Sequence, residues 1–241
     1  MAYDFLELVN SVNRRLNEVE LTSGQFPTAK GWYAQCKDAV NSSIRDIQQA
    51  HYEWPFNHVT QNETLVAGTM RYAFPANVSS VDMDSFRIRR NNTFGNETVR
   101  LVPITYDEYL QKYADYEYDT TNTSIRDVPE YVCRTQNNYF IVTPPPKEAY
   151  TLDYEYFSSP NDLALYNDTT SIPEKFKHVI IDGAMYYAYM FRSNEQAASM
   201  AKTKFDEGLK KMRTLLINEY EYVSSTYVPT SMRYIAGPRL G

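Results

Sequence analysis

The residues that could do chemistry are few and scattered in this sequence. Its 241 residues include three histidines, His51, His58 and His178, and two cysteines, Cys36 and Cys133. Protein metal sites use histidine and cysteine ligands at characteristic close spacings, and these five residues show none. Two lone thiols are more typical of small buried apolar side chains than of a disulfide or a zinc site. We therefore predict no metal and no cofactor.

Paired carboxylates are the other chemistry to consider. Asp107 and Glu108 are adjacent, while Asp82 and Asp84 would share one solvated face of a strand. A two-carboxylate hydrolase needs its acids across a cleft, and nothing in the sequence points to one. A Gly-rich phosphate loop, a nucleophile elbow and a zincin pattern are also missing from the sequence. The sequence predicts a protein that is not an enzyme.

Helical periodicity marks both ends of the chain. Residues 2–20 repeat apolar side chains every three or four positions, which predicts an amphipathic helix. The residues expected to face solvent there are Asn10, Asn13, Arg14, Asn17 and Glu18. A second helix should end near Trp54, because a residue before proline avoids helical geometry. Ser171 is the expected cap of a third helix, and a break at 193–195 precedes a fourth.

Strand patterns fill the middle of the chain. The segment Tyr150–Phe157 nearly alternates apolar and polar residues, so its tyrosines and Leu152 should share one face. Tyr139–Thr143 must end at the following prolines, which cannot donate to a sheet ladder. Further strands are predicted at 69–74, 81–90 and 98–104, with a loop at 111–126. Short strands with turn-rich spacers favour a small sandwich or barrel.

We predict an α+β fold in which helices from both ends form an antiparallel bundle with an inserted β-sandwich or barrel. Residues 1–56 and 171–222 would form the bundle, 57–170 the β domain, and 223–241 an extended C-terminal arm. Such an arm could become ordered in a partner's groove, and a frayed terminus is the alternative. Its candidate anchors are Tyr227, Val228, Met232, Arg233, Tyr234, Ile235, Arg239 and Leu240.

Bulk properties restrict the partners. A net charge of −6 disfavours a protein that grips nucleic-acid phosphates, although an acidic wall could let DNA slide past. No apolar run approaches the roughly 18 to 20 residues of a membrane span. The start of the chain does not read as a secretory signal, so we expect a soluble protein of a reducing compartment. Seven Asn-X-Ser/Thr tripeptides, one of them at Asn41, are best explained by composition.

The 22 tyrosines suit both strand faces and association surfaces. Tyr113, Tyr116 and Tyr118 stand in an acidic segment, which is a poor setting for stacking nucleic-acid bases. Sugars could still stack on such rings. A glycan-binding β module of a tail or secreted protein is therefore the alternative function.

The order of elements resembles the head-to-tail adaptor proteins of tailed bacteriophages, especially tail tubular protein A-like adaptors of short-tailed phages. The segments that carry this resemblance are Trp54-Pro55-Phe56, Tyr72–Pro75, Val81–Ile88, Leu101–Tyr109, Pro129-Glu130-Tyr131, Tyr139–Pro146 and Tyr150–Phe157. The final helix pair and the trailing arm complete the series.

The resemblance implies a structural virion protein that forms a ring, usually of twelve copies, under the portal of a filled head. The implied partners are further copies of the chain, the portal protein and the tail nozzle protein, with tail fibres as an additional contact. Genomic DNA would pass through the channel without sequence-specific binding, and the arm at 223–241 would reach into the portal. The family transfers no cofactor and no active-site residue. The implied location is the virion neck, after assembly in the host cytoplasm.

Overall fold

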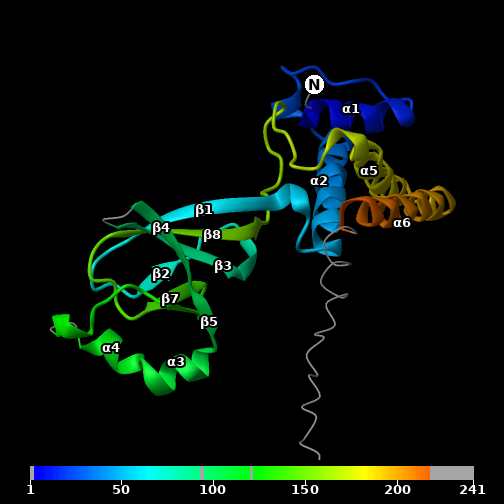
Figure 1. The fold of residues 1–241 in the computed structure, drawn as a ribbon. Coiled ribbons are helices and arrows are strands. Elements are labelled where there is room, and N and C mark those ends of the chain that lie inside the picture. Colours follow the sequence, from blue (N-terminus) through cyan, green and yellow to red (C-terminus); the bar gives the residue numbers. More distant parts are fainter. Residues whose placement is uncertain (1–2, 93–94, 120–121, 218–241) are drawn as a thin grey trace, which may run out of the picture.

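The computed structural model describes residues 3–92, 95–119 and 122–217. Figure 1 shows two bodies joined by a narrow neck. Helices α1, α2, α5 and α6, from the two ends of the chain, form the helical body. Strands β1 to β8, together with α3 and α4, form the β body. This mixture of helix and sheet confirms the predicted α+β class.

Helix α1 spans Phe5–Arg15 and begins at an Asp4 cap, whose carboxylate accepts a hydrogen bond from the Glu7 N–H at 2.8 Å. It is shorter than the predicted helix at 2–20. The chain leaves helical geometry at Asn17, whose φ of 57° lies in the left-handed region. Apolar spacing alone could not place this end, because Val19 continues the pattern yet is exposed.

Asn10 and Asn13 are buried, so the prediction that they face solvent is wrong. The Asn10 amide donates to the Leu21 carbonyl at 2.9 Å and accepts from the Leu21 N–H at 2.8 Å. Asn13 Oδ1 accepts from the Trp32 indole N–H at 3.2 Å and lies 3.4 Å from the Cys36 sulfur. Burial of an amide is tolerable when hydrogen bonds replace its lost water. These contacts hold the segment after α1 against the helical body.

The other helices of this body share one hydrophobic core with α1. Their bounds are Trp32–Ala50 for α2, Lys177–Phe191 for α5 and Glu195–Ile217 for α6. Gly183 lets α5 approach its neighbours, because a Cβ there would lie 2.8 Å from the Phe205 ring and closer still to Ser43 Oγ. The Ser171 cap is a wrong prediction: a 3₁₀ turn at Glu174–Phe176 precedes α5, and Ser171 bonds elsewhere.

Two four-stranded sheets make up the β body. The first is fully antiparallel, in the order β1 (His58–Leu65), β8 (Tyr150–Ser158), β3 (Val78–Asn92) and β4 (Gly95–Arg100). The second has the order β2 (Arg71–Ala73), β7 (Tyr139–Thr143), β6 (Tyr131–Arg134) and β5 (Val102–Ile104), with β5 parallel to β6.

The predicted strand at 98–104 is two strands in different sheets. They meet at Leu101, which is fully buried and whose N–H donates to the Phe86 carbonyl at 2.9 Å. Strand β1 was not predicted, because only Leu65 of its eight residues is buried and its sequence is mostly polar. A strand of this kind forms by backbone pairing with β8 rather than by an apolar pattern of its own.

Aromatic rings fill the core of the β body. Tyr154 stacks on Phe86 with ring centroids 4.8 Å apart, and both contact Phe140 edge to face. Offset stacking and edge-to-face geometry stabilise aromatic pairs beyond area burial. The prediction that the tyrosines of β8 and Leu152 share one buried face is confirmed.

The predicted loop at 111–126 is partly helical. It contains the end of α3 (Tyr106–Lys112) and all of α4 (Ala114–Tyr118). Glu117 anchors α4 to the second sheet: Arg71 of β2 donates to its carboxylate at 2.8 and 3.0 Å. The Tyr109 hydroxyl adds a third hydrogen bond at 2.7 Å. Tertiary contacts of this kind stabilise helices too short to form alone.

Asn57 organises the neck between the two bodies. It is 3% exposed, and its amide donates to Gln48 of α2 and accepts from the Ser171 hydroxyl at 2.7 Å. The Ser158 hydroxyl, at the end of β8, donates to the Asn57 carbonyl at 3.2 Å. One buried residue, through its side chain and its backbone carbonyl, therefore ties together both chain crossings between the helical body and the β body.

Candidate assembly surfaces

The histidines and cysteines do not come together. No group of three or more metal-binding side chains occurs among the residues that the structure describes. Cys36 and Cys133 are free and buried in different bodies. Burial raises the pKa of the Cys36 thiol to about 12 and that of Cys133 to about 11. Thiols held neutral in this way are poor nucleophiles, in agreement with their interpretation as apolar core residues.

The carboxylate pairs have structural roles. Asp82 and Asp84 are exposed on β3, as predicted, and Asp84 pairs with Arg100. Asp107 and Glu108 lie in the first turn of α3, where acidic side chains favour the positive end of the helix. Glu108 also pairs with Lys112 one turn later, at 2.7 Å. None of these acids faces another across a cleft.

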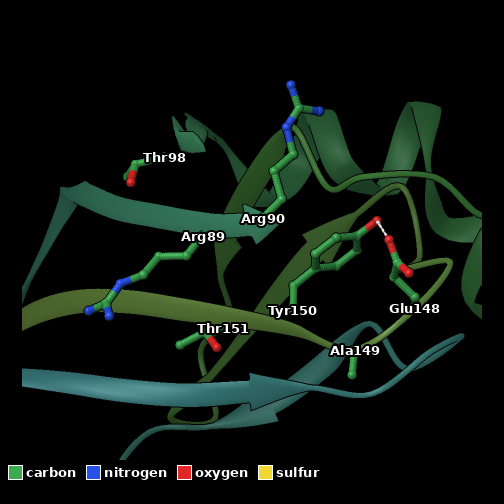
Figure 2. A pocket seen from close by; sticks show the side chains of 7 residues that line it. All are labelled: Arg89, Arg90, Thr98, Glu148, Ala149, Tyr150 and Thr151. Carbon is green, nitrogen blue, oxygen red and sulfur yellow. Dashed lines mark hydrogen bonds between the residues drawn. The ribbon is translucent and has the colours of Figure 1, made fainter. Parts of the chain in front are cut away.

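A polar pocket of about 390 Å³ opens on the first sheet and is shown in Figure 2. Its two arginines point in different directions: Arg89 pairs with Asp153, and Arg90 with Glu97 at 2.6 Å. The Tyr150 hydroxyl donates to Glu148 at 3.2 Å. The Tyr150 ring is only 5% exposed, so it offers no flat face for a sugar. These lining groups are already satisfied by neighbours within the chain.

The tyrosines considered for sugar stacking do not form a row. Tyr113 and Tyr116 pack partly buried against the small core around Tyr109. Tyr113 also stacks on Tyr131 of β6, with ring centroids 5.7 Å apart. Only Tyr118 is freely exposed, at 83%. A single ring gives weak support to the glycan-binding alternative, which needs several aligned faces.

Exposed apolar side chains occur on both bodies, and two groups of them lie on the helical body. Met190, Phe191 and Met200 are about half exposed or more around the turn between α5 and α6. Leu165 and Tyr166 are exposed on the segment that returns from the β body to α5. Apolar side chains that a fold leaves uncovered mark places of association. Spacing could not have revealed them, since Phe191 belongs to the same apolar stripe as buried residues.

Charge is divided unequally along the chain. Residues 57–170 contain 16 acidic and 9 basic residues, whereas residues 171–217 contain 5 acidic and 8 basic ones. The acidity that suggested a sliding wall for DNA therefore belongs to the middle of the chain. The last two helices are net basic.

Two further predictions concern the C-terminal arm and membrane-spanning segments. The eight candidate arm residues, Tyr227 to Leu240, all lie outside the described residues. Within the described part of the chain, none of the helices combines the length and the apolar character needed to cross a bilayer.

The chain is an α+β protein whose described polar groups are largely hydrogen-bonded internally and whose large exposed apolar side chains lie on both bodies, features that fit a structural assembly protein. The model of the SU10 adaptor protein family matches residues 3–230, and the chain belongs to that family. A comparison with curated proteins finds no significant match.

Membership of this family confirms the resemblance to phage head-to-tail adaptors. It implies a structural role in the virion neck and contact with other head and tail proteins. It also favours the adaptor interpretation over a glycan-binding module.

Proposed function

We propose that this protein forms the adaptor ring that connects the portal to the tail nozzle. Residues 1–56 and 171–222 would act as the wall of the ring, and residues 57–170 would project from it toward the tail. The ring would contain about twelve copies, as the resemblance implies, and would surround the path of the genomic DNA. The family match over residues 3–230 is the observation that carries this proposal.

The arrangement of the two bodies supports these separate roles for the helical body and the β body. The helical body and the β body have separate hydrophobic cores and meet at a neck organised by one buried asparagine. Separate cores allow each body to keep its shape while contacting a different partner. The net basic α5–α6 pair would make the inner wall less repulsive to DNA than the net charge of the chain suggests.

The C-terminal segment supplies the proposed contact with the portal. Residues 223–241 would bind in grooves of the portal ring through Tyr227, Val228, Met232, Tyr234, Ile235 and Leu240, with Arg233 and Arg239 adding charge. Many copies docked on one ring would raise the effective concentration of each further contact. Assembly would thus follow portal formation.

Deletion of residues 223–241 tests this proposal. We expect the shortened chain to be folded and monomeric, with an unchanged thermal transition, and to be absent from portal complexes seen by electron microscopy. The control is a chain in which only Arg233 and Arg239 are replaced by Lys, which keeps charge and length. Portal binding by the deleted chain at full strength would refute the role of the arm.

A further inference from the structure

A turn at residues 164–168, between the β body and α5, is held rigidly on the helical body. The Asp168 carboxylate accepts hydrogen bonds from the N–H groups of Ala164 and Leu165, each at 2.7 Å. The carbonyl of Tyr166 accepts from the Leu6 N–H at 3.0 Å, and that of Asp168 from the Phe5 N–H at 2.8 Å. The backbone of this turn is therefore fixed to the start of α1.

The residue before the turn is fixed as firmly. The Asn41 amide of α2 donates to the Leu163 carbonyl at 3.0 Å and accepts from the Leu163 N–H at 3.1 Å. Leu163 itself is buried in the helical core. This pair of hydrogen bonds gives Asn41, the first residue of one of the Asn-X-Ser/Thr tripeptides, a structural role.

The two large side chains of this rigid turn are left without cover. Leu165 is 63% exposed and Tyr166 is 41% exposed. A fold that needed them for its own stability would bury them. Apolar side chains presented by a fixed backbone lose little entropy on binding, which is what an interface anchor requires.

A groove at the other end of α1 is lined by both apolar and charged side chains. It encloses about 480 Å³ between the end of α1, α5 and α6. Its apolar lining comes from Met185, Tyr189, Ala197, Met200 and Ala201. The rim carries Lys204 and an Arg15–Asp182 pair at 2.5 Å. The surface of the groove is therefore part apolar and part polar, and its charged side chains carry one more positive than negative charge.

The charges of the two surfaces are opposite. Asp162, near the turn, is already paired with Arg45 at 2.6 Å, so Asp168 gives the turn its net negative charge. Hydrogen bonds from the Ala164 and Leu165 N–H groups lower the pKa of Asp168, a carboxylate that is ionised at neutral pH in any case. The positive rim and the negative turn would steer two copies together and oppose the pairing of like surfaces.

The positions of the two surfaces favour a ring over a dimer. The turn is bonded to the first residues of α1, and the groove includes its last residue, so about 15 Å of helix separates them. In Figure 1 the connecting segment and the tip of the α5–α6 hairpin lie on opposite sides of the helical body. Two different patches that bind each other between copies give head-to-tail contacts, which close into a ring when the rotation allows.

We propose that the 164–168 turn of one copy binds in the α1–α5–α6 groove of the next copy. Leu165 and Tyr166 contact the apolar side chains of the groove, and Asp168 lies near Lys204 at its rim. This contact rests on the proposed function, because it specifies how the adaptor ring closes.

Disulfide trapping between full-length chains tests the contact directly. A Leu165→Cys chain is mixed with a Met200→Cys chain under mild oxidation; both sites are exposed and the native cysteines are buried. We expect this mixture to form cross-linked dimers about tenfold faster than Leu165→Cys mixed with Tyr118→Cys, a control on the exposed β body. A chain with both Leu165→Cys and Met200→Cys should give a ladder of larger species.

A charge substitution tests the specificity of the same contact. Lys204→Glu in the Met200→Cys chain should slow the cross-linking several-fold, while Lys211→Glu, the same change on α6 outside the groove, should leave the rate unchanged. Equal rates for the Met200 and Tyr118 pairings, or equally fast self-linking of Leu165→Cys, would overturn the proposal. If rings form on portals but the Leu165–Met200 cross-link does not, the proposed contact is wrong and the adaptor function stands. If the chain never binds portals, the adaptor function is wrong as well.

Discussion

Replacement of Gly183 by alanine probes the tightest packing of the helical body. At this position α5 lies against Ser43 of α2 and Phe205 of α6. A Cβ would stand 2.8 Å from two carbons of the Phe205 ring and closer still to Ser43 Oγ. The Ser43 hydroxyl cannot retreat freely, because it donates to the Ile180 carbonyl at 2.8 Å and is fully buried.

The expected cost follows from two opposing effects. Alanine in place of glycine within a helix normally stabilises by about 1 kcal/mol. Overpacking of a close-packed core costs about 1 to 3 kcal/mol, and displacement of a buried hydrogen bond adds about 1 to 3 kcal/mol. The net destabilisation should be about 1 to 5 kcal/mol, which corresponds to a fall of roughly 2 to 20 °C in Tm for a chain of this size.

Thermal unfolding followed by far-UV circular dichroism measures this change. Gly24→Ala is the control, because nothing lies within 4 Å of its added Cβ, and its Tm should stay within about 1 °C of the parent. Ser43→Ala in the Gly183→Ala chain should recover part of the loss, since it removes the nearest clashing atom. An unchanged or higher Tm for Gly183→Ala would refute this account of the helix packing.

Further expectations concern single groups. Hydrogen bonding from Arg71 lowers the pKa of Glu117, so the stability that this pair contributes is present above the ordinary carboxyl pKa and is lost as pH falls through the lowered value. Glu117→Gln should therefore be less stable than the parent at pH 7, and this difference should shrink as pH falls below the ordinary carboxyl pKa; a constant difference in Tm would contradict this. Cys36 and Cys133 should resist a thiol reagent at pH 8 in the folded chain and react after denaturation, because their pKa values are about 12 and about 11. Asn10→Ala should lower the free energy of unfolding by about 1 to 3 kcal/mol, because it leaves buried backbone groups unpaired; urea titration would show this, and an unchanged midpoint would disprove it.

Local periodicity was sufficient where one physical effect dominates. Tyr150–Phe157 alternates because one face of β8 is buried and the other is not, so burial could be predicted residue by residue. In α1, Phe5, Val9 and Val12 face the hydrophobic core of the helical body for the same reason, at helical spacing. The mixed fold class and the resemblance to phage adaptors followed from such patterns and from the order in which they occur.

The same reasoning failed where side chains find distant partners. Asn10 and Asn13 look solvent-facing until Leu21 and Trp32 supply their hydrogen bonds. Ser171 looks like a helix cap, yet its hydroxyl bonds to Asn57, more than a hundred residues away. Polar groups gain most from partners in a dry environment, and a local window contains no information on which distant group will be there.

The sequence by itself determined the four main helices, the strongly patterned strands, their order and the scarcity of reactive groups, because these depend on residue types and near neighbours. Strand β1 and helix α4, which lack such a pattern, were missed. Only the tertiary structure decided which apolar side chains remain uncovered. Leu165 and Met200 differ little from core leucines and methionines in the printed sequence, and they become interface candidates because the rest of the fold stops short of them. Surface exposure is a property of the whole packed molecule, so it could be learned only after the helices and sheets were in place.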